Sequence, residues 1–264
     1  MNNLNVLSKI VSEGLLSLYP VFVKHIDLPI QTQMWSRFFS YTFFSMFFID
    51  KTIISLITSW NGLLLMVVTM IHVFVSYQGF LLLESGISYA LFYTYPVFIY
   101  LGTYFSIHPY FIFPVLGTWL MYYDNKQINL LGIGMILLAA ITEAMIYFIV
   151  RRLKTPNPWN HVFISYVMGA ILFSVFVKDI QKLKTTTTLI SVGINAIIGL
   201  VGYLLRFYAT TRLPPIVFSF LSYFGIIMAF IYGIIFSQES ITFLKILSTI
   251  LILIPSIQQK LLSP

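Results

Sequence analysis

The chain has 264 residues; 59% of them are hydrophobic, 9% are charged, and the formal net charge is +7. A soluble fold of this length cannot bury so much apolar surface, because much of any soluble chain faces water. The composition therefore excludes a soluble globular protein and predicts an integral membrane protein whose apolar side chains face lipid.

Apolar stretches with few charges recur along the whole chain between short polar breaks. A helix needs about 20 residues to cross about 30 Å of hydrocarbon, and most of the stretches reach that length. In chain order, the predicted membrane helices are residues 10–23, 30–49, 56–80, 86–105, 107–122, 130–150, 160–178, 187–208, 213–236 and 241–258. The pattern predicts an all-α integral membrane fold with about ten transmembrane helices.

Several function classes are disfavoured by motifs that the sequence lacks. There is no cysteine, and so no disulfide and no thiolate metal site. There is also no Gly-x-Ser-x-Gly, His-Glu-x-x-His or P-loop pattern, so we expect no enzyme, no ATP-driven pump and no bound cofactor. The positive charge is scattered over loops, which is typical of a membrane surface; nucleic acid would need a basic face outside the bilayer.

Two segments of the first half align with segments of the second half. Residues 13–24 match residues 143–154 at an offset of 130, and in both a glutamate lies in an apolar stretch that ends at a lysine. Residues 77–96 match residues 205–224 at an offset of 128. Apolar helices resemble each other by composition, but two matches at nearly one offset are stronger evidence than either alone.

These offsets predict two repeats, at residues 1–126 and 127–264, within one membrane domain. Five helices in each half would make the second half run upside down relative to the first. Such inverted repeats are typical of secondary transporters, which place their substrate site near the middle of the membrane, between the halves.

Three segments and one arginine carry a family resemblance. In residues 203–225, a small residue comes before a run of residues that leads up to the middle of a predicted helix. In residues 234–243, the dipeptide Gln-Glu lies in the turn before the last predicted helix. Residues 88–99 carry a proline in the fourth predicted helix, and Arg37 lies in the second. In these features the chain resembles the EamA-like ten-helix permeases of the drug/metabolite transporter superfamily.

The match has departures. Phe224 stands where the family has a second proline, Ser248 replaces a glycine in the last helix, and no glutamate follows the fourth helix at His108-Pro109. The resemblance implies a secondary transporter, or permease, that moves a small organic metabolite or drug-like solute by alternating access. Because of the departures, a non-transporting scaffold or partner subunit with the same fold stays the alternative.

Charged side chains inside predicted membrane helices are costly, so they usually face a cavity or a partner. Glu13 and Glu143 occupy matching places in the two halves, toward opposite faces of the membrane; they either couple transport to protons or form hydrogen bonds between helices. Arg37 either attracts an anionic substrate or pairs with a carboxylate such as Glu13. Arg206 lies near a helix end, where we expect it to reach the membrane surface.

Uncharged polar groups complete the candidate site. The predicted substrate-binding residues are Arg37, His72, Gln78, Tyr95, Asn195 and Tyr223. His72 relays protons or bonds a neighbouring helix, and Asn195 lies between Gly193 and Gly199, where close helix packing is the favoured explanation. A polar cavity lined by Arg37, His72 and Gln78 would favour the transporter, and a solid apolar centre would favour the scaffold.

The expected partners follow from these predictions. They are the lipid bilayer, a small-molecule substrate, coupled protons and a second copy of the chain in a homodimer. We expect a multi-pass location in a membrane and no nucleic-acid partner.

Overall fold

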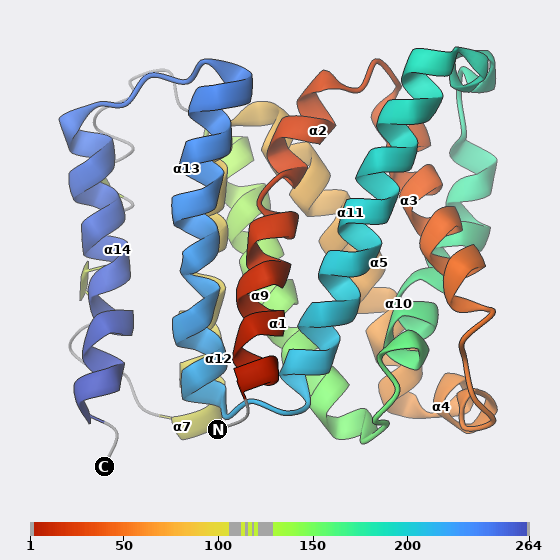
Figure 1. Cartoon of the computed structure of the whole chain (residues 1–264), viewed down its shortest axis with the longest axis horizontal. Helices are drawn as coiled ribbons and strands as arrows, with labels where there is room; N and C mark the ends of the chain where they lie inside the picture. Colours follow the sequence, from red (N-terminus) through yellow and green to blue (C-terminus); the bar gives the residue numbers. More distant parts are fainter. Residues whose placement is uncertain (1–2, 106–111, 114–115, 118, 121–128, 263–264) are drawn as a thin grey trace.

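The structure is a computed structural model and describes residues 3–105, 112–113, 116–117, 119–120 and 129–262. Every regular element in these ranges is a helix, and the helices lie side by side in a bundle (Figure 1). The predicted all-α fold is therefore confirmed. Most of the predicted helix at residues 107–122 lies outside the described residues.

Six segments within the described ranges are long and apolar enough to cross a membrane. They are Asn3–His25, Trp60–Leu82, Leu130–Leu153, Pro158–Phe176, Thr186–Thr210 and Pro215–Ser237. The chain is thus a multi-pass membrane protein, as its composition predicted.

The helices of the first half of the chain are mostly short and are separated by breaks. They are α1 (Asn3–Leu16), α2 (Tyr19–His25), α3 (Ile30–Ser45), α4 (Ile53–Thr58), α5 (Trp60–Leu82), α6 (Ser85–Phe92) and α7 (Tyr95–Tyr104). The first predicted helix, residues 10–23, is in fact longer, because α1 and α2 together cover Asn3–His25.

Most helices of the second half are longer. They are α9 (Leu130–Leu153), α10 (Pro158–Leu172), α11 (Thr186–Thr210), α12 (Pro215–Ser222), α13 (Phe224–Ser237) and α14 (Phe243–Leu262). Short 3-10 helices η2 (Phe173–Phe176) and η3 (Ile180–Lys184) join α10 to α11, so the predicted helix at residues 160–178 ends early.

Side-chain caps explain where two helices of the second half begin. Asn129 accepts hydrogen bonds from the first backbone N–H groups of α9, and Asn157 does the same for α10, which starts with Pro158. Asparagine is a strong helix cap, and proline suits the first turn because the N–H it lacks would have no partner there.

Three helices break near the middle of the bundle. The α1–α2 break precedes Pro20, and the α6–α7 break precedes Pro96, the proline of the fourth predicted helix. The α12–α13 break falls at Tyr223, where no proline follows. Carbonyl groups near the first break are satisfied by distant side chains: Tyr89 donates its hydroxyl to the carbonyl of Leu16. Such breaks are tolerated in a membrane only where the backbone is buried in protein.

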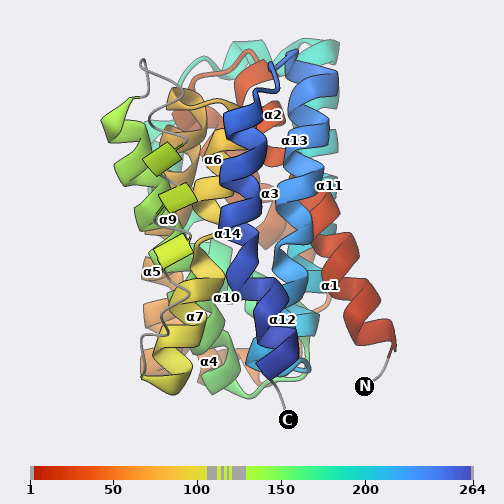
Figure 2. The ribbon, with the colours of Figure 1, turned by 90° about the vertical axis from the view of Figure 1, so that its left-hand side faces the viewer.

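The two halves interlock. Helix α1 packs on α11, α5 packs on α9, α3 packs on α10, and the broken helices meet as α6 with α13 and α7 with α12. Helix α1 begins and α14 ends at the same end of the bundle, which is the lower end in Figures 1 and 2. We call this the lower end and the opposite one the upper end.

Candidate functional site

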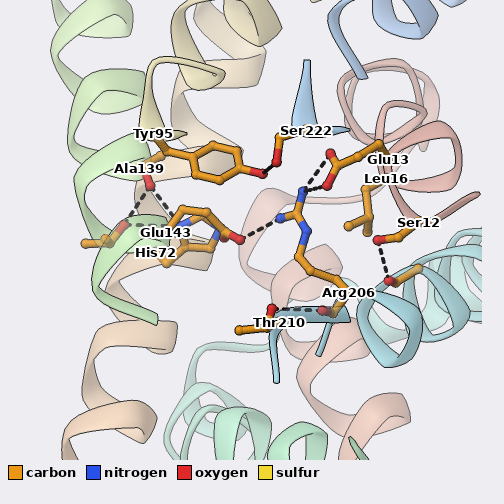
Figure 3. A network of polar contacts seen from close by, with 12 residues as sticks. Ser12, Glu13, Leu16, His72, Tyr95, Ala139, Glu143, Arg206, Thr210 and Ser222 are labelled. Atoms are coloured by element: carbon orange, nitrogen blue, oxygen red, sulfur yellow. Dashed lines mark hydrogen bonds and ion pairs between the residues drawn. The ribbon is translucent and has the colours of Figure 1, made fainter. Parts of the chain in front are cut away.

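Arg206 lies at the centre of a buried polar network (Figure 3). One terminal nitrogen donates to Glu143 on α9 at 2.6 Å, and the other donates to both carboxylate oxygens of Glu13 on α1 at 2.9 Å. All three residues are buried. The expectation that Arg206 reaches the membrane surface is therefore wrong, because two buried carboxylates bind its guanidinium through charge-assisted hydrogen bonds inside the bundle.

Lys9 and Tyr93 also donate hydrogen bonds to Glu13 and connect it to the start of α7. Lys9, one turn earlier on α1, donates to Glu13 and, at 3.2 Å, to the hydroxyl of Tyr95. Tyr93 also donates to Glu13, and Tyr95 donates to Ser222 at 2.7 Å. Lys9 is fully buried. The predicted first helix, residues 10–23, leaves Lys9 outside the membrane, but α1 begins at Asn3 and carries Lys9 into the interior.

Glu143 faces His72 on the other side of the network. Its second oxygen lies 3.4 Å from Nε2 of His72, and Nδ1 of His72 lies 3.1 Å from both the carbonyl of Ala139 and the hydroxyl of Thr142. His72 thus bonds α5 to α9, as one of its two predicted roles required. Among the described residues, no group of three or more histidine, aspartate and glutamate side chains could hold a metal ion.

Arg37 on α3 sits in a cage of tyrosine rings. The guanidinium carbon lies between 4.4 and 5.6 Å from the ring centres of Tyr19, Tyr41, Tyr77, Tyr166 and Tyr203. Arg37 donates one hydrogen bond, to the hydroxyl of Tyr166 at 3.1 Å. The pair between Arg37 and Glu13, one of the two alternatives left open by the sequence, is not formed: no ion pair of Arg37 is found within the described residues, and Glu13 is bound by Arg206 and Lys9.

A small cavity lies between the tyrosine cage and the network. It is lined by Leu16, Tyr19, Arg37, His72, Ser76, Phe80, Tyr89, Phe92, Tyr203 and Arg206. Its free volume is about 10 Å³, about the space that one water molecule needs. The centre of the bundle is thus polar rather than solid and apolar, but in this conformation it is too small for an organic solute.

The six residues predicted to bind substrate divide into two groups. Arg37 and His72 line the cavity, and Tyr95 belongs to the network around Glu13. Gln78 is half-buried, Asn195 is buried on α11, and Tyr223 is buried at the α12–α13 break; none of these three lines the cavity. Helical position alone did not reveal which face of each helix turns inward.

Ion pairs join the two halves at the upper end. Lys24 lies 3.7 Å from Glu239 and donates to Ser85 at 3.1 Å, and Lys245 donates to Glu84. Glu239 also accepts a backbone hydrogen bond from Ser85 at the start of α6. Each ion pair links a residue of the first half to one of the second.

The lower end has a different character. An open pocket of about 360 Å³ is lined by Arg151, Lys154, Thr155, Pro156, Thr211 and Arg212. The carboxylate of Asp50 lies nearby in the loop before α4, where hydrogen bonds from Thr52 and Asn160 hold its pKa below the usual range. No carboxylate is among the residues that line this basic pocket.

Comparison with known proteins agrees with this architecture. Residues 130–257 match the model of the EamA-like transporter family. A solved structure entitled "Crystal structure of protein" has a TM-score of 0.67 over 98% of this chain and 97% of that chain, at 10% identity, which shows a shared fold. No curated protein sequence matches significantly. This match, over the second half of the chain, is to a family of the drug/metabolite transporter superfamily, in agreement with the resemblance of the sequence.

Proposed function

We propose that this membrane protein is a secondary transporter that moves a small organic solute by alternating access. The observation that carries the proposal is the polar cavity at the centre of the bundle, lined from the first half by Arg37 and His72 and from the second by Arg206. Buried charge is costly in a membrane and usually marks a pathway for a solute or ion. The family match supports transport as the general activity.

Two inverted five-helix repeats are the second part of the proposal. The packing of helices supports them, because exchanging the halves preserves the pairs: α1 with α11 corresponds to α9 with α5, and α1 with α13 corresponds to α9 with α7. The breaks at Thr94 and Tyr223 also lie near the offset of 128 residues seen in the sequence. A site between such repeats can be exposed to either side by a rocking motion.

The two ends of the bundle suggest how access alternates. At the upper end, Lys24–Glu239 and Glu84–Lys245 hold the halves together, while the lower end carries an open pocket. Lys24 is 23% exposed and its partner Glu239 is 11% exposed, while Glu84 is 38% exposed and its partner Lys245 is buried. Each pair therefore has at least one partly solvated member. Partly exposed ion pairs contribute little stability, so they can break during a transport cycle.

Proton coupling fits the His72–Glu143 pair better than Glu13. Glu13 is bound by Arg206, Lys9 and Tyr93, whereas the second oxygen of Glu143 has no hydrogen-bond partner within the described residues and faces His72. A proton shared by His72 and Glu143 would weaken the hold of Glu143 on Arg206. Both glutamates thus stay candidates, with Glu143 first.

Uptake into proteoliposomes tests the function. The purified chain is reconstituted in liposomes loaded with a panel of unlabelled organic solutes, and entry of the matching labelled solute by counterflow is measured. We expect at least one solute to show saturable exchange that Arg37→Ala reduces and Arg152→Gln, at an exposed site, does not. A correctly folded protein that exchanges no solute would instead support the scaffold.

A further inference from the structure

Arg37 brings a positive charge into the bundle that no described carboxylate balances. The buried charged residues near the centre are Lys9, Arg37 and Arg206 on the positive side and Glu13 and Glu143 on the negative side. Glu13 and Glu143 both bind Arg206, and Glu13 also binds Lys9. With His72 neutral, one positive charge remains, and it belongs to Arg37.

The tyrosine cage compensates Arg37 only in part. Ring faces attract a cation, but less strongly than a buried anion does. A buried charge without a counter-charge is expensive, and it persists in proteins where it serves a function. Residues of both halves build the cage: Tyr19, Tyr41 and Tyr77 come from the first, and Tyr166 and Tyr203 from the second.

Two hydrogen-bond donors in this cage have no partner. Nε of Arg37 and the hydroxyl of Tyr77 are buried and make no hydrogen bond in the described part of the chain. The ring centre of Tyr77 lies 5.6 Å from the guanidinium carbon of Arg37. Buried donors are nearly always satisfied in native proteins, so two unsatisfied donors beside an unbalanced charge indicate a missing anionic acceptor.

We propose that Arg37 and Tyr77 bind the carboxylate of a monoanionic organic solute. The inference rests on the proposed transport function and names the class of substrate. One negative charge balances the excess, whereas a phosphate dianion would exceed it. The planar guanidinium of Arg37 matches a carboxylate in size and geometry.

The other charged groups argue against a zwitterionic solute such as an amino acid. An ammonium group would need a carboxylate, but neither Glu13 nor Glu143 is among the residues that line the cavity, and both bind Arg206. The cavity holds only about 10 Å³, so the solute enters in a conformation in which the cage has opened. Relative motion of the two halves opens it, because each half contributes rings.

Thermal unfolding of the detergent-solubilised full chain tests the binding directly. The ligands are sodium acetate and sodium benzoate, with acetamide and benzamide as uncharged analogues and sodium phosphate and glycine as other classes, all at matched ionic strength. We expect at least one carboxylate to raise the unfolding midpoint while its amide does not. Equal effects of acid and amide, no effect of either carboxylate, or a response to phosphate or glycine alone would overturn the proposal.

Two variants connect the effect to these side chains. Arg37→Gln and Tyr77→Phe should each weaken carboxylate binding by about tenfold or more, since each removes a donor to a charged acceptor. Arg37→Gln should also raise the midpoint of the ligand-free protein, because it removes the unbalanced charge. Arg152→Gln and Tyr232→Phe, outside the cage, are the matched controls and should bind as the wild type does.

The outcome separates this inference from the transport proposal. Exchange of only uncharged solutes in proteoliposomes, with no carboxylate effect on unfolding, would sustain transport and overturn the anion site. Carboxylate stabilisation that depends on Arg37, without exchange of any solute, would sustain the anion site and contradict transport.

Discussion

Glu13 on α1 and Glu143 on α9, 130 residues apart in the sequence, bind the same guanidinium, that of Arg206. We had placed them toward opposite faces of the membrane, yet both reach one point inside the bundle. Because Glu13 belongs to the first half and Arg206 and Glu143 to the second, the shared arginine connects the two halves beside the cavity.

Arg206→Gln should destabilise the protein strongly. It leaves Glu13 with Lys9 and leaves Glu143 without its cation, and breaking a buried ion pair from one side costs about 3–5 kcal/mol. We expect a marked fall in the thermal unfolding midpoint, and partial recovery in Arg206→Gln combined with Glu143→Gln, which removes the unpaired charge. Arg152→Gln is the control at an exposed arginine. If the two substitutions lowered the unfolding midpoint additively in the double variant, the coupling between Arg206 and Glu143 would be contradicted.

Glu143→Gln should abolish the dependence of uptake on a pH gradient while solute exchange persists. The amide cannot take up and release a proton beside His72, but it can still accept a hydrogen bond from Arg206. Glu13→Gln should have the smaller effect on the gradient response. The measurement compares gradient-driven uptake with counterflow in the same proteoliposomes. A full gradient response in both variants would assign the glutamates to interhelical bonding.

Gly199→Ala should destabilise the bundle, whereas Gly193→Ala on the same helix should not. A Cβ at Gly199 would overlap the hydroxyls of Tyr19 and Tyr41, while nothing lies within 4 Å of the corresponding position at Gly193. Overpacking costs about 1–3 kcal/mol, and alanine within a helix gains up to about 1 kcal/mol over glycine. Unfolding midpoints of the two variants give the comparison, and equal midpoints would exclude the close contact.

Breaking the upper ion pairs should expose the cavity from that side. In this cysteine-free chain, Ser76→Cys places one thiol at the cavity lining. Adding Lys24→Gln and Glu84→Gln should speed the labelling of this thiol by an impermeant maleimide that is supplied on the side of the membrane opposite the chain termini. The labelling rate should rise by up to about fivefold, because partly exposed ion pairs contribute about 1 kcal/mol or less to stability. Arg152→Gln, at an exposed site of the lower end, serves as the control. An unchanged rate would mean that these pairs do not close the cavity.

Both ends of the chain should lie on the same side of the membrane. Cysteines introduced at Asn3 and Gln259 lie at the start of α1 and near the end of α14, which share the lower end of the bundle. An impermeant thiol reagent should therefore label both from one side only. Labelling from opposite sides would require an odd number of crossings and contradict the repeat arrangement.

The sequence by itself determined the environment and the secondary structure. An apolar fraction of 59% with 9% charged residues requires lipid as the surrounding solvent, and in lipid the backbone must satisfy its own hydrogen bonds as helices. The cost of buried charge also singled out Arg37, Glu13 and Glu143 as residues of the centre. These inferences depend on composition and local pattern, which do not change when the helices are rearranged.

Only the tertiary structure decided which partner each charge takes. Arg206 appears near a helix end in the sequence, yet it binds Glu13 and Glu143, because helices distant in sequence surround it. For the same reason, Arg37 is surrounded by tyrosine rings and does not pair with Glu13, which was one of the two roles that the sequence left open. Membrane helices are apolar on most faces, so periodicity does not fix which side of α5 or α11 turns inward, and Gln78 and Asn195 could not be placed relative to the cavity before the helices were packed.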